Sequence, residues 1–323
     1  MTKVAVVTGA GRGIGRAVVG ALAEQGFHVV VNDTGGSFDG SGGDTSVAEV
    51  AACEIRASGG VACANTDSVA TMAGARSLVG CALDTYGRVD VLVNNAGITR
   101  QNMVWDMAEE EFDDVVATNL KGTFACVKAA VPHMIEQRSG SIVNMSSGVS
   151  MAGSVAASNY CASKAGIIGF TFATAMELGP FGIRVNAIFP AGHSRLHTKP
   201  EPWRDRYRVT ERPPMPADAW PVEAVLPVVT FLAGHDSRDV NGQLFAAGGT
   251  TVGWYDTWTP SREVPTPPPG DPEATSATMR ALLDGVRNPS PAQEGTVDEF
   301  VWPWVRPGGL PTAHDADGPR DEQ

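Results

Sequence analysis

Two side chains that lie four residues apart, Tyr160 and Lys164, suggest proton-transfer chemistry. Apolar residues follow them at helical spacing, so the phenol and the ammonium are expected on one face of a helix. A nearby ammonium favours the phenolate and lowers the pKa of a tyrosine, which is about 10 when unperturbed. We therefore expect Tyr160 to exchange protons near neutral pH. A Tyr and a Lys that only face solvent share this spacing, so the interpretation depends on the surrounding elements.

A glycine-rich turn near the start of the chain predicts a nucleotide site. An apolar run over residues 3–8 is typical of a buried strand, and it is followed by Gly9, Gly13 and Gly15 and then by a helical pattern. Glycines let the backbone approach a pyrophosphate closely, and the helix N-terminus offers free N–H groups to an anion. The spacing differs from the G-x-G-x-x-G fingerprint, and an ordinary turn is the alternative.

An acidic residue after the second strand bears on the choice of nucleotide. Asp33 lies 18 residues after Gly15, close to the offset of about 20 residues at which a carboxylate binds the adenosine ribose. A carboxylate there repels a 2′-phosphate, so we expect NAD rather than NADP. Arg12 can offset part of that repulsion, and Asp33 can instead cap a helix or a turn. Asp67, after the third strand, is expected either to cap the next helix or to face an adenine.

The rest of the pattern predicts an α/β fold. Strands near 29–31, 60–64, 89–97, 140–147, 183–190 and 240–249 alternate with helices near 46–58, 68–86, 108–136, 160–178 and 221–233. We expect a Rossmann-type doubly wound parallel sheet in a single domain, residues 1–255. Asn119 and Gly122 lower helix stability within 108–136, so a functional bend is expected there. The glycine-rich residues 34–44 exceed the usual loop length and are expected to be mobile.

Composition excludes several other classes of protein. The net charge of −12 argues against nucleic acid as a partner. The start of the chain lacks a signal peptide, and no run of 18 apolar residues occurs, so a cytoplasmic protein without membrane contact is expected. The five cysteines lack metal-ligand spacing, which predicts reduced, mostly buried thiols and no metal.

Taken together, these motifs resemble the classical short-chain dehydrogenase/reductase family. The matching residues occur in family order over about 3–253: Thr8, Gly9, Gly13, Gly15, Asn94, Asn95, Ala96, Gly97, Asn119, Ser147, Tyr160, Lys164 and a late Gly-Gln with its Gly-Gly ending. The segments 31–36 and 190–196 look most like the dehydrogenase unit of peroxisomal multifunctional β-oxidation enzymes and its bacterial single-domain relatives. One departure is Pro190 followed by Ala191, where the family usually has Pro-Gly.

The resemblance implies roles for the site residues. Tyr160 would be the acid or base, Ser147 would hydrogen-bond the same substrate oxygen, Lys164 would hold the phenolate charge and the nicotinamide ribose, and Asn119 would hold a relay water. Ser146 is the adjacent alternative to Ser147. NAD would be bound by Gly9, Arg12, Gly13, Ile14, Gly15, Asp33, Asp67, Ser68, Asn95, Ala96, Gly97, Tyr160, Lys164, Pro190 and Ser194. The family also implies a homodimer or homotetramer.

The implied reaction interconverts a secondary alcohol and a ketone. The leading small-molecule substrate class is 3-hydroxyacyl-CoA, the alternative is a hydroxysteroid or natural-product alcohol, and a non-catalytic nucleotide-binding scaffold is a remote alternative. In the family, residues near 193–220 form the substrate lid. Here that segment carries six Lys or Arg against four Asp or Glu, which suits an anionic substrate such as an acyl-CoA. The alternative is a solvated flap whose arginines pair with neighbouring carboxylates.

The composition changes after Tyr255. Residues 256–323 hold 12 of the 22 prolines and twelve Asp or Glu against five Arg, so we interpret them as a Pro-rich acidic extension. Residues 265–270 are typical of a semi-rigid linker, and Asp271 followed by Pro272 predicts the start of one short helix. Its apolar stripe, Met279, Leu282, Leu283 and Val286 together with Phe300, Trp302 and Trp304, is expected to pack on this subunit or a neighbour. Residues 312–323 are expected to be disordered.

Overall fold

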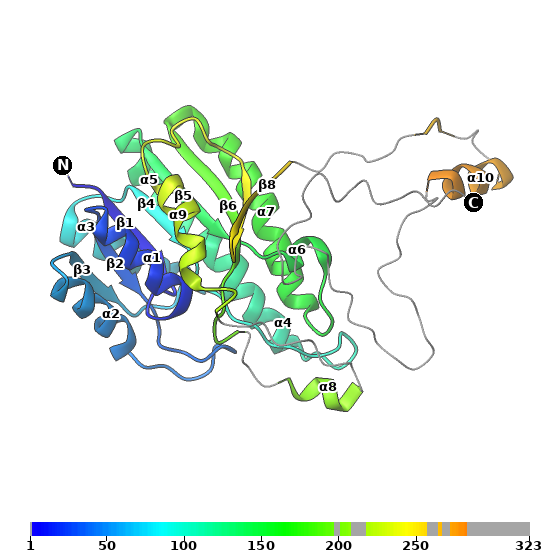
Figure 1. The fold of residues 1–323 in the computed structure, drawn as a ribbon, viewed down its shortest axis with the longest axis horizontal. Helices are drawn as coiled ribbons and strands as arrows, with labels where there is room; N and C mark the ends of the chain where they lie inside the picture. The colour runs from blue at the N-terminus through cyan, green and yellow to red at the C-terminus, as the bar shows by residue number, and fades with distance from the viewer. Residues whose placement is uncertain (1, 197–200, 208–217, 257–263, 267–271, 283–323) are drawn as a thin grey trace.

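The computed structural model describes residues 2–196, 201–207, 218–256, 264–266 and 272–282. Its centre is an eight-stranded sheet in the order β3-β2-β1-β4-β5-β6-β7-β8 (Figure 1). The strands are β1 (Val4–Thr8), β2 (His28–Asn32), β3 (Val61–Asn65), β4 (Val91–Asn94), β5 (Gly140–Met145), β6 (Ile183–Ala191), β7 (Leu244–Gly248) and β8 (Thr251–Tyr255). Neighbouring strands run parallel as far as β7, and β8 pairs with β7 antiparallel.

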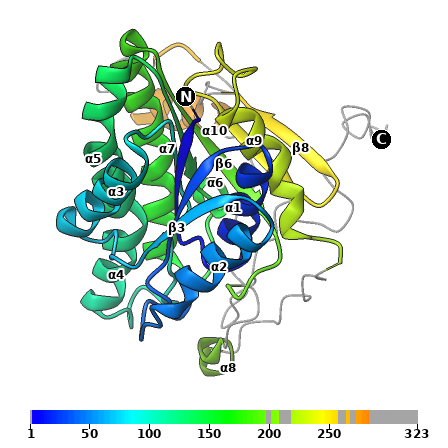
Figure 2. The same ribbon diagram turned by 90° about the vertical axis from the view of Figure 1, so that its left-hand side faces the viewer.

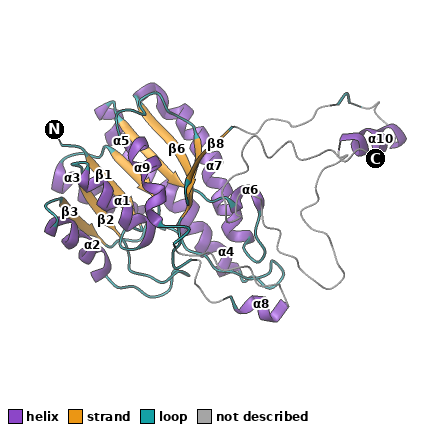
Figure 3. Cartoon of the chain, in the orientation of Figure 1, coloured by secondary structure: helices purple, strands orange, loops and turns teal. Residues whose placement is uncertain are grey.

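Helices connect these strands and cover the sheet (Figure 3). They are α1 (Gly13–Glu24), α2 (Ser46–Ala57), α3 (Met72–Tyr86), α4 (Glu109–Val116), α5 (Gly122–Gln137), α6 (Val149–Ala152), α7 (Ser158–Leu178), α8 (Pro202–Tyr207), α9 (Leu226–Ala233) and α10 (Pro272–Leu282), with short turns η1 (Ala117–Lys121), η2 (Gly179–Phe181) and η3 (Val222–Val225). The Asp271–Pro272 signal thus marks a real helix, α10. The rest of the predicted extension lies largely outside the described residues.

Two hydrophobic layers explain the continuous apolar strands. Along β1, Val4 and Val6 pack in the layer formed with α3, α5 and α7, whereas Ala5 and Val7 pack in the layer formed with α1, α2 and α9. Figure 2 shows the two groups of helices on opposite sides of the sheet. Because helices cover both faces of the sheet, the side chains on both faces of each central strand must be apolar.

The chain reverses its direction of strand addition between β1 and β4. In a doubly wound sheet, the loops after these two strands open into a crevice at their carboxyl ends, where ligands bind. Here those loops carry the glycine turn and the residues 95–97. The predicted α/β Rossmann-type fold is confirmed, and it brings together motifs that lie 87 residues apart, as the Thr8–Asn95 contact shows.

Two elements differ from the sequence expectations. The edge strand β8 was not predicted. Val252 and Trp254 on this strand are 56% and 59% exposed, so the sequence there lacks the apolar run that is typical of a buried strand. The helix predicted to begin at residue 68 begins at Met72, where Thr71 accepts a hydrogen bond from the N–H of Gly74 as its cap.

The bend expected within 108–136 is a π-helical turn. The segment Ala117–Lys121 separates α4 from α5 and contains Asn119, which is fully buried. Single π turns inside helices are found frequently at functional sites, because they shift the side chains that follow them. Among the described helices, none is both long and apolar enough to cross a membrane.

Candidate active site

Glycine is required at the turn after β1 by close backbone packing. A Cβ on Gly9, whose φ is +61°, would lie 2.8 Å from the Cα of Ala96, and a Cβ on Gly15 would lie 2.2 Å from the carbonyl oxygen of Gly9. Gly13 also has a positive φ of +54°, but a Cβ there would meet only Ser194, at 3.8 Å. Gly13 therefore faces open space, as expected of a backbone that a phosphate approaches.

The loop after β4 is tied directly to this turn. The side-chain amide of Asn95 donates to the carbonyl oxygens of Thr8 and Gly9, both at 2.9 Å. The Thr8 hydroxyl in turn accepts the N–H groups of Asn95 and Ala96, at 3.0 and 2.9 Å. Asn95 thus shapes the crevice through its amide, and Thr8, to which the sequence analysis assigned no role, holds the two loops together.

Asp33 is buried at the crevice and already holds two backbone groups. Its carboxylate accepts the N–H of Gly11 at 2.9 Å and the N–H of Gly35 at 2.7 Å. Asp33 is only 6% exposed. The carboxylate therefore links the glycine turn to the start of the 34–44 loop.

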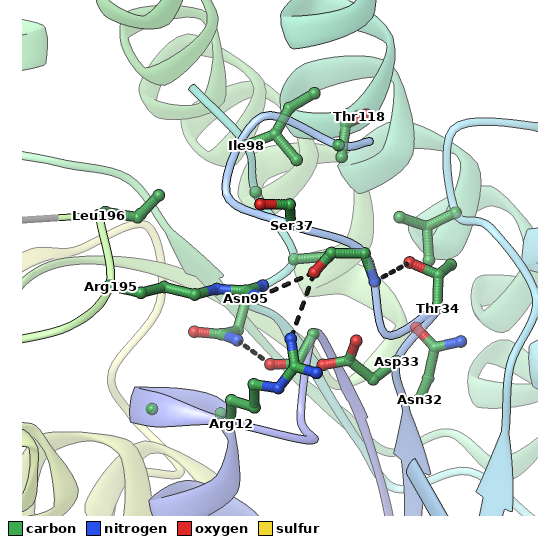
Figure 4. A pocket seen from close by; sticks show the side chains of 18 of the residues that line it. Arg12, Asn32, Asp33, Thr34, Ser37, Asn95, Ile98, Thr118, Arg195 and Leu196 are labelled. Carbon is green, nitrogen blue, oxygen red and sulfur yellow. Dashed lines mark hydrogen bonds between the residues drawn. The ribbon is translucent and has the colours of Figure 1, made fainter. Parts of the chain in front are cut away.

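Two guanidinium groups converge beside Asp33 (Figure 4). Arg12 and Arg195 each donate to the carbonyl oxygen of Gly36, at 3.4 and 2.8 Å. Burial lowers the pKa of Arg195, the neighbouring Arg12 lowers it as well, and Asp33 raises it. Arg195 was expected in the lid and not at this crevice; its basic charge directly after Ser194 was the only available signal.

The 34–44 loop is anchored rather than free. Its Gly36 carbonyl is held by the two arginines, its Phe38 carbonyl accepts the N–H of Thr99 at 2.9 Å, and its Asp39 carbonyl accepts Arg100 at 2.9 Å. These bonds connect the loop to segments after β4 and β6. The expectation of a mobile loop is therefore not supported, because length and glycine content do not reveal such tertiary bonds.

Asp67 does not cap α3, since Thr71 does so. Its carboxylate accepts hydrogen bonds from the side chains of Asn65 and Ser77, both at 2.7 Å. Asp67 and the exposed Ser68 line the crevice beside Asn32. Of the two alternatives left open by the sequence, capping of α3 does not occur, and Asp67 lines this cavity.

Two adjoining cavities hold all of the residues predicted to bind the cofactor. The first, of about 320 Å³, lies at the carboxyl ends of β1 to β4, and the second, of about 190 Å³, lies beside α7. The lining residues shared by both are Ile14, Asn95, Gly97, Ser194 and Leu196. Ser147, Tyr160, Lys164 and Pro190 line the second cavity. A nucleotide that enters the first cavity can therefore reach the second.

The hydroxyl of Ser147 lies beside the phenol of Tyr160 in the second cavity and lowers the pKa of that phenol. Burial raises the pKa of Tyr160 to about 12, which outweighs the lowering effect of Ser147. Lys164 donates to the carbonyl oxygen of Met145 at 2.7 Å, and its Nζ lies 5.6 Å from the centroid of the Tyr160 ring. The expectation of a phenol pKa below its ordinary value is thus wrong for this arrangement, because burial raises this pKa more than the neighbouring groups lower it. Tyr160 carries its proton at neutral pH, which is the form that can donate to a ketone oxygen.

The two adjacent serines have different surroundings. The Ser146 hydroxyl donates to the carbonyl oxygen of Lys164 at 2.7 Å and is 2% exposed. Ser147 contacts Tyr160 and is partly exposed to the cavity. The arrangement favours Ser147 as the group that meets a substrate, as the spacing predicts.

Asn119 lies behind the cavity wall. Its amide oxygen accepts the N–H of Ile98 at 2.9 Å, and its amide nitrogen donates to the Ile98 carbonyl and to Ser163, both at 3.1 Å. A Cβ built on Gly97 would lie 3.3 Å from the Asn119 amide oxygen and 3.6 Å from the Nζ of Lys164. Asn119 and Lys164 thus both lie against Gly97, where a Cβ would crowd the Asn119 amide oxygen.

The described part of the predicted lid includes the helix α8. The buried Trp203 packs against Met103 and Ala156 and donates to Gln101 at 3.2 Å. Arg204 pairs with Glu201 and lies 4.5 Å from the centroid of the Trp203 ring. Arg204 therefore follows the alternative expectation, in which the arginines of this segment pair with neighbouring carboxylates. Lys199, Arg208 and Arg212 lie outside the described residues.

The fold and the crevice define a dinucleotide-binding oxidoreductase with a Tyr, Lys and Ser site. A family model described as short chain dehydrogenase matches residues 3–201. The chain belongs to the short-chain dehydrogenase family. It is accordingly an oxidoreductase that acts on hydroxyl or keto groups, in a family that uses NAD or NADP.

Individual relatives agree with this assignment. The chain is 46% identical over 190 residues to a 3-oxoacyl-(acyl-carrier-protein) reductase of Staphylococcus aureus, covering 59% of this chain and 74% of that protein. It is 40% identical over 251 residues to the peroxisomal multifunctional enzyme type 2 of Mus musculus, covering 78% of this chain but 32% of the relative. A solved short chain dehydrogenase from Mycobacterium avium is 38% identical with a TM-score of 0.74, covering 90% of this chain and 97% of that one.

Proposed function

We propose that this chain is an NAD-dependent dehydrogenase that interconverts 3-hydroxyacyl and 3-oxoacyl thioesters, with coenzyme A as the leading carrier. The observation that carries the reaction type is the placement of the Ser147 and Tyr160 hydroxyls side by side in a cavity that adjoins the nucleotide crevice. The substrate class is supported by two relatives: one is named for a 3-oxoacyl thioester, and the other is a peroxisomal multifunctional enzyme whose dehydrogenase unit the motifs resemble.

The residues suggest how the proton moves. In reduction, the protonated phenol of Tyr160 donates its proton to the ketone oxygen, while the Ser147 hydroxyl donates a hydrogen bond to the same oxygen as negative charge develops. In oxidation the same groups act in reverse. Lys164, which is 4% exposed, places a positive charge beside the phenol ring and favours the charged phenolate after proton loss. When bound, the nicotinamide supplies or accepts the hydride.

The crevice fits a dinucleotide cofactor. The glycine turn at Gly9 and Gly15 leaves no room for side chains, and Gly13 presents its backbone to the cavity. The carboxylate of Asp33 at the end of β2 favours a ribose with a free 2′-hydroxyl. Arg12 and Arg195 oppose this preference, because two guanidinium groups near Asp33 can also attract a 2′-phosphate. We infer that NAD is preferred, by a margin that these arginines reduce.

The basic lid contributes little to the substrate argument. Arg204 is paired with Glu201 and stacked on Trp203, so its charge is already neutralised by a neighbour. The choice of a thioester therefore depends on the relatives, and a hydroxysteroid or another bulky secondary alcohol stays the alternative substrate.

The test is an initial-rate panel with the purified chain. Reduced-nicotinamide formation is followed with NAD or NADP and with a (3R)-3-hydroxyacyl-CoA, its short pantetheine analogue, a hydroxysteroid and simple secondary alcohols. The proposal predicts the highest kcat/KM for NAD with the acyl thioesters. A preference for the steroid or a simple alcohol would refute the substrate class but keep the catalytic assignment, whereas a preference for NADP would refute the cofactor assignment.

A further inference from the structure

Two thiols contact each other outside the active site. Cys63 lies on β3, the edge strand of the sheet, and Cys81 lies on α3, which packs beside it; their Sγ atoms are 3.7 Å apart. Both are partly exposed. Of the five cysteines only Cys126 is buried, so the expectation of mostly buried thiols does not hold. The proposed reaction uses neither Cys63 nor Cys81.

The surroundings of the pair make its two sulfurs unequal. The thiol of Cys81 hydrogen-bonds to Cys63 and lowers the Cys63 pKa to about 6, although burial opposes the shift. The hydroxyls of Tyr86 and Thr85 and the guanidinium of Arg56 lower it as well. The pKa of Cys81 is raised by the bond to Cys63 and by burial. Cys63 is therefore the nucleophilic thiolate and Cys81 the resolving thiol.

We propose that Cys63 and Cys81 form a peroxide-reactive dithiol that closes to a reversible disulfide and thereby alters the nucleotide crevice. The Cys63 thiolate attacks a hydroperoxide, the O–O bond breaks, and a sulfenic acid forms on Cys63 with release of water or an alcohol. Cys81 then attacks the Cys63 sulfur, the S–O bond breaks, and water leaves as the S–S bond forms. Two thiols lose two electrons in total, and the hydroperoxide gains them.

The link to the crevice runs through Asp67. Cys81 follows Ser77 by one helical turn, and Cys63 precedes Asn65 by two residues on β3. Ser77 and Asn65 both donate to the same carboxylate oxygen of Asp67 at 2.7 Å. Asp67 lines the nucleotide cavity.

Closing the disulfide must shift these elements. An S–S bond is about 2.05 Å long, so the two sulfurs must approach by roughly 1.6 Å. That approach draws α3 and β3 together or turns their side chains, and it disturbs both donors to Asp67. The proposal depends on the nucleotide crevice of the family fold and not on the proposed thioester substrate.

The test uses the full chain, reduced with dithiothreitol, desalted and treated with stoichiometric hydrogen peroxide. Trypsin cleaves at Arg56, Arg76 and Arg88, so Cys63 and Cys81 fall on separate peptides, 57–76 and 77–88. Mass mapping without reductant should find these two peptides joined. The joined species should be lost in Cys63→Ser and in Cys81→Ala, which serve as independent variants, and retained in Cys53→Ser, the matched control at an exposed cysteine.

Coupling is measured by titrating NADH and NADPH fluorescence with the reduced, oxidised and re-reduced protein. The proposal predicts that oxidation raises the nucleotide Kd by about threefold or more, a loss of about 0.7 kcal/mol, and that dithiothreitol restores it. Recovery of the two peptides unlinked, or linked through Cys53 between chains, would overturn the proposed pair. A linked pair with an unchanged Kd would overturn the coupling to the crevice.

Discussion

Substitution of two adjacent serines should separate catalysis from stability. We expect Ser147→Ala to fold normally but to lose most of its turnover. Ser147 contacts the phenol of Tyr160 and faces the second cavity, and removal of one donor to a developing negative charge costs about 10²- to 10³-fold in kcat. Ser146→Ala should instead retain most of its kcat. Its hydroxyl donates at 2.7 Å to the carbonyl of Lys164 in the core.

The magnitude for Ser146 follows from its burial. A buried carbonyl that loses its hydrogen-bond donor costs about 1 to 3 kcal/mol in unfolding free energy. In a domain of this size each kcal/mol lowers Tm by about 2 to 4 °C. Ser146→Ala should therefore melt between about 2 and 12 °C below the wild type, whereas Ser147→Ala should melt close to it.

The assays are a thermal melt followed by circular dichroism and an initial-rate measurement on the same preparations. Ser158→Ala, at the exposed start of α7, is a control for a serine-to-alanine change near this site. Equal losses of kcat in Ser146→Ala and Ser147→Ala would refute the assignment of one serine to structure and the other to chemistry. A large drop in Tm for Ser147→Ala would refute it as well.

Three further predictions concern the cofactor site and its charges. Asp33→Asn should raise the ratio of NADP to NAD affinity by about tenfold, or 1.4 kcal/mol, as measured by fluorescence titration; an unchanged ratio would exclude Asp33 from cofactor choice. Arg195→Met should raise the nucleotide Kd about threefold to tenfold, because it releases Gly36; equal affinity would show that this bond does not close the crevice. Burial lowers the folded pKa of Lys164 to about 8, so the folded state loses its proton before the unfolded state does, and unfolding free energy should rise with pH between about 8 and 10.5. Lys164→Met, compared with wild type in urea titrations across that range, should not show this rise; parallel pH profiles would contradict it.

The sheet could be predicted because its central strands are covered on both faces. Val4 to Val7 are all buried, which produces an uninterrupted apolar run in the sequence. The strand β8 escaped prediction for the opposite reason, since it lies at the sheet edge and exposes Val252 and Trp254. Helix boundaries were less well predicted where several nearby residues could serve as the N-cap. At α3, for example, Thr71 is the cap, although Asp67 and Ser68 precede it.

The candidate site was predictable where one residue type is required and less so where tertiary contacts decide. The glycine turn and the Tyr160 to Lys164 spacing carry their chemistry in the sequence. The convergence of Arg12 and Arg195 on Gly36 could not be predicted from the sequence, because Arg195 and Gly36 lie 159 positions apart. The raised pKa of Tyr160 was also unpredictable, since it depends on burial rather than on its neighbour four residues later.

The central claim is that Tyr160 transfers the proton to and from the substrate oxygen. The most direct measurement is kcat for Tyr160→Phe against wild type, together with the nucleotide Kd of both proteins. Loss of the phenol proton should reduce kcat by about 10²- to 10⁴-fold while the nucleotide Kd stays within about twofold, because only the hydroxyl is removed. Turnover by Tyr160→Phe at a rate near that of the wild type would contradict the mechanism.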